Sequence, residues 1–237
     1  LVIECHEISA TKDIEIKTLP CRVHKLELVA PDVMVISLKL PTNQRLQFLA
    51  GQYIDILLKD GKRRSFSLAN APHDDEYLEL HARNYPGGVF TEHVFTNMKV
   101  KDMLRFTGPL GSFFLRDTPE ECSIIFLASG TGFAPIKSIL EHVFHQEGGR
   151  HRKRNMTLYW GARTKSDLYL ADLADKWQRE HDNFTFVPVL SEPLSSDNWQ
   201  GRTGLVHQAV MHDFPSLETH QVYACGVPVM VKAAYHD

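Results

Sequence analysis

The spacing of hydrophobic and polar residues changes about halfway along the chain. Up to about residue 115, short alternating or β-branched runs are broken by turn residues, a pattern typical of β-strands. Short strands that follow one another so closely predict an antiparallel β-barrel or sandwich, with one short helix at residues 90–97. The predicted strands cover residues 21–28, 33–40, 53–58, 65–69, 77–82 and 103–107.

From residue 122 onwards, continuous apolar runs alternate with amphipathic segments. Residues 123–128 are almost wholly apolar, as expected of a strand that is buried on both faces. Such alternation predicts right-handed βαβ units around a parallel sheet, in a Rossmann-like α/β domain. The predicted strands cover residues 123–128, 156–160, 184–190 and 222–225, and the predicted helices cover residues 134–146, 168–179 and 205–212.

The charged, proline-containing segment 116–121 separates the two patterns. We therefore expect an antiparallel barrel over residues 19–118 and an α/β domain over residues 119–237, preceded by a linker over residues 1–18. Two domains of this kind leave a cleft between them, and such clefts are preferred sites for ligands.

Composition narrows the classes of function. The 237 residues are 43% hydrophobic and 23% charged, with a formal net charge of −3, so nothing favours nucleic acid or an anionic membrane as a partner. No apolar run is long enough to span a membrane, and the four cysteines form no CxxC pair, which favours a reducing, cytoplasmic compartment. Glu141, His142 and His145 could share a helical face, but their polar, arginine-rich surroundings predict a solvated helix end, and we expect no metal site.

Residues 128–135 follow an apolar strand and open a helix, which is the context that a phosphate-binding loop requires. Gly130 and Gly132 would let the backbone approach a phosphate, and the helix N-terminus would supply unpaired N–H groups. Pro135 stands where the usual dinucleotide motif has its third glycine, so the motif is not the standard one. A plain strand-to-helix turn is the alternative.

Two further motifs lie in the predicted barrel. Residues 64–67 read Arg-Ser-Phe-Ser and offer a cation for a phosphate, an aromatic surface for a planar ring and hydroxyls for a ring nitrogen. The alternative is an ordinary barrel strand. Residues 87–88 are two glycines before a short helix, which indicates either a second anion site or a simple capped loop.

In the second half, the 130–135 loop, residues 161–163 and Cys225 all follow predicted parallel strands. Ligands of open α/β sheets bind beyond the carboxyl ends of the strands. The convergence of these three segments therefore predicts a ligand site at that edge of the sheet.

In this order and spacing, the motifs resemble those of the ferredoxin–NADP reductase superfamily over about residues 20–230. The resemblance implies that a flavin lies on the barrel, that NAD(P)H lies on the α/β domain, and that hydride passes from nicotinamide C4 to flavin N5. The matching segments are residues 64–67 and 87–91 for the flavin, 108–113 for the link between domains, and 130–135, 159–163 and 225–228 for the nicotinamide nucleotide.

The resemblance also implies individual roles. Arg64 would hold a flavin phosphate, Phe66 would pack on the flavin ring, and the two expected catalytic residues, Ser67 and Cys225, would face flavin N5 and the nicotinamide. The expected flavin-binding residues are Arg64, Ser65, Phe66, Ser67, His81, Ala82, Gly87, Gly88, Val89, Phe90 and Thr91. The expected NAD(P)H-binding residues are Gly130, Thr131, Gly132, Pro135, Gly161, Arg163, Ser191, Glu192, Cys225, Gly226 and Pro228.

Within the superfamily, the chain most resembles the flavin reductase modules of bacterial oxygenase reductases and of CDP-6-deoxyglucoseen reductase. Residues 1–8 resemble the end of a plant-type ferredoxin, so we expect residues 1–18 to be a linker from an upstream domain that carries a 2Fe–2S cluster. The chain would then pass electrons from NADH through FAD to an iron–sulfur domain or to an oxygenase or dehydrase component. The alternatives are a stand-alone NAD(P)H–flavin reductase that releases reduced flavin, and a non-catalytic flavin- or nucleotide-binding relay subunit.

The choice of cofactors depends on two loops. The 87–91 loop before a helix fits a pyrophosphate, which favours FAD over FMN. Relatives that use NADPH commonly carry Ser-Arg where this chain has Ser191-Glu192, and a carboxylate would repel the 2′-phosphate, so we expect NADH; Arg202 lies nearby and could still serve a phosphate. Val231 stands roughly where ferredoxin–NADP reductases proper carry a glutamate, and the chain stops at Asp237, so we expect the nucleotide domain to be incomplete at its C-terminus.

Overall fold

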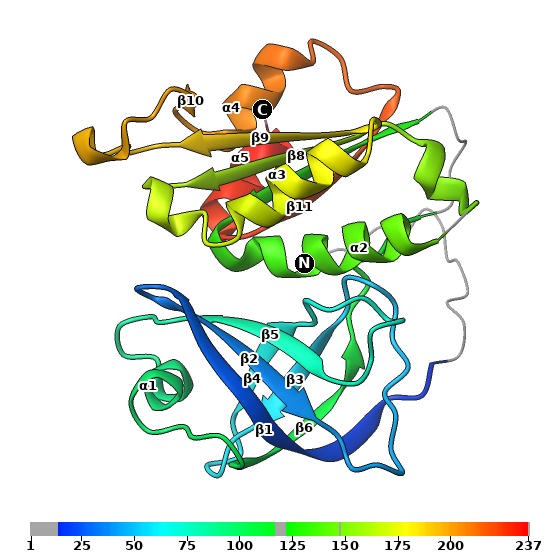
Figure 1. Ribbon diagram of the computed structural model, residues 1–237, viewed down its shortest axis with the longest axis vertical. Helices are drawn as coiled ribbons and strands as arrows, with labels where there is room; N and C mark the ends of the chain where they lie inside the picture. Colours follow the sequence, from blue (N-terminus) through cyan, green and yellow to red (C-terminus); the bar gives the residue numbers. More distant parts are fainter. Residues whose placement is uncertain (1–13, 117–121, 147, 237) are drawn as a thin grey trace.

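The computed structural model describes residues 14–116, 122–146 and 148–236, and it places a barrel beneath an α/β domain (Figure 1). The barrel strands are β1 (Lys17–Ala30), β2 (Val33–Lys39), β3 (Tyr53–Leu57), β4 (Arg63–Ser67), β5 (Leu78–Arg83) and β6 (Met103–Leu110). They form one antiparallel sheet in the order β4-β3-β6-β1-β2-β5. Just after β4, Leu68 forms an antiparallel bridge with Leu80 of β5, and this bridge closes the sheet.

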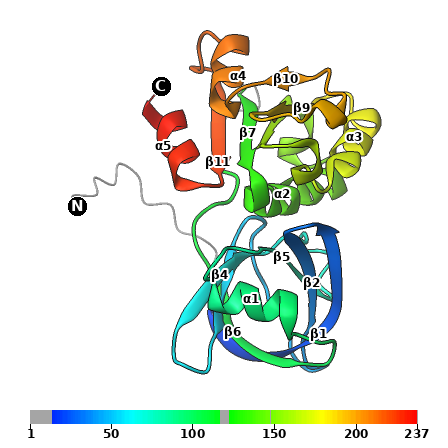
Figure 2. The ribbon, with the colours of Figure 1, turned by 90° about the vertical axis from the view of Figure 1, so that its left-hand side faces the viewer.

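Alternating burial builds the interior of the barrel. In β3, Ile54 and Ile56 are fully buried, whereas the residues between and beside them are partly exposed. Helix α1 (Val89–Thr96) lies across the barrel in Figure 2 and adds Phe90 and Val94 to the same core. Removal of these apolar side chains from water stabilises the barrel by about 25 cal/mol for each Å² that is buried.

The second domain is a five-stranded parallel sheet with helices on both faces (Figure 2). Its strands are β7 (Ser123–Ser129), β8 (Met156–Ala162), β9 (Phe184–Leu190), β10 (Arg202–Thr203) and β11 (His220–Cys225), in the order β10-β9-β8-β7-β11. Its helices are α2 (Phe133–His145), α3 (Ala171–Glu180), α4 (Val206–Asp213) and α5 (Pro228–His236). Its 3₁₀ turns are η1 (Gly130–Gly132), η2 (Arg150–Lys153), η3 (Lys165–Asp167) and η4 (Ser195–Asp197).

The five residues inside strand β7 are all apolar and buried because helices cover both of its faces. Phe126 points into the core that α2 and α3 complete with Phe133 and Trp177. Its neighbour Leu127 points into the core on the other face, which α4 and α5 complete with residues such as Met230. A strand in this position has no solvent-facing side, so it shows no alternation of polar and apolar residues.

Both predicted sheets are confirmed, the first as a closed barrel. β1 begins at Lys17 rather than at residue 21, because its first residues pair with β6. α3 begins at Ala171 rather than at residue 168, because η3 precedes it and is capped by Thr164 and Asp167. The hydrophobic pattern predicts neither the two-residue strand β10 nor α5.

Parts of the predicted domain organisation cannot be placed. The predicted boundary between residues 118 and 119, and residues 1–13 of the predicted linker, lie outside the described residues. Among the residues that are described, no helix is long and apolar enough to cross a membrane.

Candidate functional site

A cleft of about 1170 Å³ lies between the barrel and the α/β domain. Its barrel side is lined by β4, by the end of β5 and by the turn that follows β5. Its other side is lined by the turn between β7 and α2, by the segments that follow β8 and β9, and by the segment that follows β11. The carboxyl ends of the parallel strands therefore face the barrel, which is where open α/β sheets bind their ligands.

Four consecutive residues of strand β4, residues 64–67, line one wall of the cleft. Because side chains alternate along a strand, Arg64 and Phe66 share one face, and the two serines share the other. The Phe66 ring is held from behind by Phe90 of α1, with the ring centroids 5.4 Å apart. Ser65 Oγ donates a hydrogen bond of 2.7 Å to Asp55 Oδ1, so this hydroxyl is already engaged. The wall therefore presents a cation beside a fixed aromatic surface.

The opposite wall is built largely from backbone, at the turn between β7 and α2. Gly130 adopts a φ of +53°, which favours glycine, and its carbonyl accepts a hydrogen bond of 3.1 Å from Trp160 Nε1. The Trp160 ring stacks on Phe133, with centroids 4.0 Å apart. A Cβ at Gly132 would overlap the carbonyl of Cys225, so the turn packs directly on the end of β11. This packing leaves the turn that opens α2 facing the cleft, where the partial positive charge of a helix N-terminus favours an anion.

The end of β11 completes this wall with Cys225 and Gly226. Gly226 adopts a φ of +152°, and a Cβ there would overlap Ser129 Oγ. The same Ser129 Oγ accepts a 3.0 Å hydrogen bond from the backbone N–H of Val227. Burial raises the pKa of the Cys225 thiol to about 11, against a smaller lowering by the Gly226 backbone. The thiol is therefore protonated at neutral pH and acts as a neutral contact rather than as a thiolate nucleophile.

Arg83, at the end of β5, is a cleft residue that the motifs do not predict. Its guanidinium lies between two carboxylates, 3.5 Å from Asp32 of the barrel and 3.9 Å from Asp167 of the α/β domain. The buried Nε and Nη2 have no hydrogen-bond partner among the described residues, and a Cβ at Gly130 would lie 3.5 Å from the guanidinium carbon. The arrangement places two N–H donors, without hydrogen-bond partners in the described part of the chain, beside the turn between β7 and α2. A basic residue two positions after His81, just before the Pro-Gly-Gly segment, is the signal that could have indicated it.

The structure brings most of the predicted site residues into the one cleft. Those that line it are Arg64, Ser65, Phe66, Ser67, His81, Thr91, Gly130, Thr131, Gly132, Gly161, Arg163, Ser191, Glu192, Cys225, Gly226 and Pro228. Those that do not line it are Ala82, Gly87, Gly88, Val89, Phe90 and Pro135.

The residues outside the cleft have identifiable places in the fold. Phe90 is buried in the barrel core, and Pro135 is buried inside α2. Gly88 belongs to a tight turn in which its N–H donates to the Tyr85 carbonyl and its own carbonyl accepts from Thr91 Oγ1. Within the 87–91 segment, Thr91 therefore lines the cleft, whereas Gly87 and Gly88 do not.

The far end of the cleft is formed by the segments that follow β8 and β9. Glu192 N–H donates to the carbonyl of Arg163 at 2.9 Å, which holds these two cleft residues side by side. Arg202 does not line the cleft. Its guanidinium is bound to the Asp213 carboxylate at 2.6 Å and to the Ala209 carbonyl at 3.3 Å. A carboxylate is therefore present at this end, and Arg202 is held elsewhere.

The residues of the cleft fit a flavin and a dinucleotide. On the barrel side, Arg64 offers positive charge and Arg83 offers N–H donors without partners among the residues described, and the N-terminus of α2 offers partial positive charge on the opposite side. Gly132 and Gly226 let the segments after β7 and β11 pack directly on each other at the edge of the cleft, and Phe66 offers a flat surface. Pyrophosphates and planar rings need these features.

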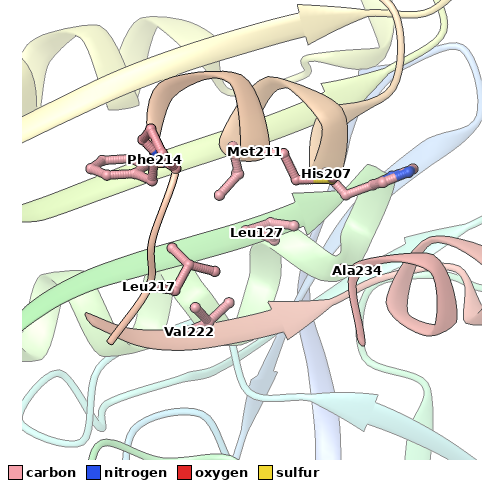
Figure 3. A pocket seen from close by; sticks show the side chains of 9 residues that line it. Leu127, His207, Met211, Phe214, Leu217, Val222 and Ala234 are labelled. Atoms are coloured by element: carbon pink, nitrogen blue, oxygen red, sulfur yellow. The ribbon is translucent and has the colours of Figure 1, made fainter. Parts of the chain in front are cut away.

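A second, smaller hollow of about 340 Å³ lies on the side of the parallel sheet that α4 and α5 cover (Figure 3). It is lined mainly by apolar side chains of α4, β11 and the loop between them, such as Met211, Phe214 and Val222. None of the predicted site residues lines it. In the described part of the chain, no three or more His, Cys, Asp or Glu residues are grouped so that they could hold a metal ion; His145 instead stacks on His73 at 3.6 Å.

Comparisons with known proteins agree with this geometry. Residues 20–115 match the oxidoreductase FAD-binding domain, and residues 126–236 match the oxidoreductase NAD-binding domain. The chain is 42% identical over 224 residues to the CDP-6-deoxy-L-threo-D-glycero-4-hexulose-3-dehydrase reductase of Yersinia pseudotuberculosis, covering 94% of this chain and 65% of that protein. It is 38% identical over 218 residues to reductase component 1 of the terephthalate 1,2-dioxygenase of a Comamonas species, covering 92% and 62% of the two chains.

A solved structure with the same fold is the cytochrome P450 reductase of Amycolatopsis. It is 34% identical, with a TM-score of 0.83, and the match covers 94% of this chain and 65% of that one. The chain therefore spans about two thirds of the length of these relatives. It belongs to the ferredoxin–NADP reductase family and comprises an FAD-binding domain and an NAD-binding domain.

Proposed function

We propose that the chain is the flavin- and nicotinamide-binding part of a reductase, which transfers hydride from NADH to bound FAD and passes the electrons to an iron–sulfur domain or to an oxygenase or dehydrase component. One observation carries this proposal. The cleft sets the Arg64–Phe66 face of the barrel opposite the Cys225–Gly226 end of the parallel sheet. A flavin on the first wall and a nicotinamide on the second would meet inside it.

On the barrel wall, the side chains bind and orient the flavin. Arg64 binds a phosphate, and Phe66, held by Phe90, packs against the planar ring. Ser67, at the end of β4, offers its hydroxyl to the edge of that ring. FAD, when bound here, supplies an acceptor that takes two electrons as hydride and can release them one at a time.

On the opposite wall, the backbone of residues 130–132 and the N-terminus of α2 bind the pyrophosphate of the dinucleotide, with Arg83 beside them. The protonated thiol of Cys225 packs beside the nicotinamide and excludes water from the contact between the two rings. The chain contributes alignment and a dry contact, and alignment of this kind supplies a large part of the rate in such reactions.

The far end of the cleft favours NADH over NADPH. Glu192 places a carboxylate where a 2′-phosphate would lie, and like charges repel. Arg202, the other candidate for a phosphate contact, is bound to Asp213 instead. A carboxylate can accept hydrogen bonds from ribose hydroxyls, which supports NADH as the electron donor.

The assignment of the electron acceptor draws on the relatives. Their names describe reductases of a dehydrase, a dioxygenase and a cytochrome P450, so each is named as the reductase of another enzyme. The chain spans about two thirds of their length, and the proposed 2Fe–2S domain would precede residues 1–18, of which residues 1–13 lie outside the described residues. A cytoplasmic location stays a prediction from the cysteines.

Anaerobic titration of the purified chain tests the proposal. We expect a yellow protein that releases FAD rather than FMN on denaturation, and whose flavin absorbance is bleached by stoichiometric NADH. The reduced protein should then pass electrons singly to a one-electron acceptor such as ferricyanide. A colourless protein that reduces added free flavin would instead support the stand-alone flavin reductase. Bound flavin that neither NADH nor NADPH bleaches would contradict both enzymes and support a relay subunit.

A further inference from the structure

A continuous chain of hydrogen-bonded side chains crosses from the barrel to the α/β domain beside the cleft. On β5, His81 Nε2 lies 2.9 Å from Glu79 Oε1. Across the interface, Lys137 Nζ of α2 lies 3.1 Å from the same oxygen and 2.9 Å from Glu141 Oε2. At the other end, His81 Nδ1 lies 2.9 Å from the hydroxyl of Tyr169, which belongs to the segment between η3 and α3. Both domains therefore contribute to one buried polar network.

The groups that face His81 determine its protonation. Burial by itself would raise the pKa of the Glu79 carboxyl, but the hydrogen bond with His81 and the charge of Lys137 lower it to about 2. Burial lowers the pKa of His81, although Glu79 opposes the shift. Burial raises the pKa of Tyr169 well above its usual value, with Arg83 opposing the shift. At neutral pH the network therefore contains a carboxylate, a neutral imidazole and a protonated phenol.

This set of protonation states leaves one consistent arrangement of hydrogens. A carboxylate accepts only, so the proton of the neutral His81 ring is on Nε2 and is donated to Glu79. Nδ1 then carries a lone pair, and the Tyr169 hydroxyl donates to it. Glu79 thus selects the tautomer of His81 that can accept the hydrogen bond from the other domain.

The network is connected to the nucleotide side of the cleft through aromatic rings. The Tyr169 ring packs edge-on against Trp160, with centroids 5.2 Å apart and an interplanar angle of 89°. Trp160 in turn donates to the Gly130 carbonyl in the turn before α2. His81 itself lines the cleft although its side chain is fully buried. A short path therefore joins the barrel strand β5 to the phosphate-binding turn.

We propose that His81 is a positioning residue for hydride transfer, which ties the flavin wall to the nicotinamide wall through its hydrogen bond from Tyr169. The proposal rests on the proposed function, because the two walls are assigned to the two cofactors there. Hydride transfer requires the two rings to lie in contact, and small displacements of such groups lower rates steeply. Loss of the hydrogen bond should therefore slow the transfer step more than it weakens the binding of either cofactor.

The first test is Tyr169→Phe, with Tyr223→Phe as the matched control. Tyr169→Phe removes the hydroxyl and keeps the ring packed on Trp160. Tyr223 belongs to the same apolar core, and its hydroxyl makes a comparable single hydrogen bond of 2.9 Å, with the Arg116 N–H. We expect Tyr169→Phe to reduce the rate of flavin reduction at saturating NADH by about tenfold, with FAD content and NADH affinity changed less than about twofold. The control should keep the wild-type rate.

A second pair of variants separates the hydrogen bond from the bulk of the ring. His81→Asn keeps a hydrogen-bond acceptor at the position of Nδ1. His81→Leu removes the acceptor and fills the space with an apolar side chain. If the hydrogen bond positions the domains, His81→Asn should recover most of the rate that His81→Leu loses. Equal rates in these two variants, or a wild-type rate in Tyr169→Phe, would overturn the proposal.

Two readouts on the purified chain without added cofactors keep this inference separate from the proposed function. The ¹⁵N shifts of His81 should report the neutral tautomer with the proton on Nε2 throughout neutral pH. Amide hydrogen exchange of β5 and of the segment before α3 should become faster in Tyr169→Phe and not in Tyr223→Phe. The other tautomer, or unchanged exchange, would contradict the role of His81 even if NADH reduces the flavin. Failure of NADH to reduce the wild-type flavin would contradict the proposed function instead.

Discussion

The two walls of the cleft differ in the groups that they present, which are mainly side chains on one wall and mainly backbone on the other. The barrel wall is formed by a strand, so its chemistry is in side chains, chiefly those of Arg64 and Phe66. The opposite wall is formed where strands end and a helix begins, so its chemistry is mainly in the backbone, and Gly132 packs directly on the backbone of Cys225. Ligand binding by the barrel wall should be lost when a side chain is removed. Ligand binding by the opposite wall should be lost when a side chain is added.

The largest effect is expected from the barrel wall. Arg64→Ala should weaken FAD binding by about 10- to 100-fold, because a hydrogen bond to a charged group contributes about 1.5–3 kcal/mol. FAD content after gel filtration and the FAD dissociation constant measure this loss. The matched control is Arg63→Ala, whose side chain is 61% exposed and lies outside the cleft, and it should retain FAD. If Arg64→Ala keeps its full flavin content, Arg64 does not bind a flavin phosphate.

The opposite wall should respond to an added methyl group. Gly132→Ala places a Cβ against the Cys225 carbonyl, and overpacking of this kind costs about 1–3 kcal/mol. We expect the affinity for NADH to fall by about tenfold or more while FAD content is retained, since β4 is untouched. Titration of the flavin charge-transfer absorbance with NADH under anaerobic conditions gives the affinity. If the variant binds NADH normally, the backbone of this turn is not the pyrophosphate site.

A smaller effect is expected where a side chain contributes to the backbone wall. Glu192→Ala removes a carboxylate from the far end of the cleft and should raise the ratio of kcat/KM for NADPH over NADH by about fivefold, since one exposed charge contributes about 1 kcal/mol. High salt should reduce the difference, because it screens exposed charges. The control is Glu218→Ala, which removes the same charge from an exposed position outside the cleft. If the ratio of kcat/KM for NADPH over NADH is unchanged in Glu192→Ala, Glu192 does not determine the preference for NADH.

The smallest effect concerns the contact between the two walls. The pKa of Glu79 is lowered from 4.5 to about 2, so its stabilising contribution is present above pH 4.5 and is lost as the pH falls from 4.5 towards 2. In Glu79→Gln, the free energy of unfolding should therefore depend less on pH below pH 4.5 than it does in the wild type. The fall in Tm between pH 6 and pH 3 should be smaller by about 2–4 °C, the change that about 1 kcal/mol produces in a protein of this size.

The control for this measurement is Glu76→Gln. Its side chain is 67% exposed and lies 3.7 Å from Lys39, so it should leave the profile unchanged. A Glu79→Gln profile that follows the wild type would indicate that this carboxylate does not stabilise the folded state.

Local motifs predicted the cleft well but not the direction in which each of their residues faces. Residues 64–67 and 130–132 line the cleft because strand alternation and the strand-to-helix turn leave little freedom there. Phe90 and Pro135 belong to the same kinds of motif, yet one packs behind Phe66 and the other is buried within α2. A motif identifies which segment approaches a ligand, whereas packing against the rest of the fold selects the side chains that reach it.

The sequence by itself determined most of the elements and their order, because the spacing of apolar residues directly reflects how many faces of a strand or helix are buried. It therefore predicted an antiparallel barrel or sandwich followed by a parallel α/β domain, and the edge of the parallel sheet that lines the cleft. Only the tertiary structure decided how the two domains meet. Arg83 between Asp32 and Asp167, and His81 between Glu79 and Tyr169, join residues far apart in the chain. Such contacts depend on how the two domains pack on each other, and this packing produces no regular spacing of residues in the sequence.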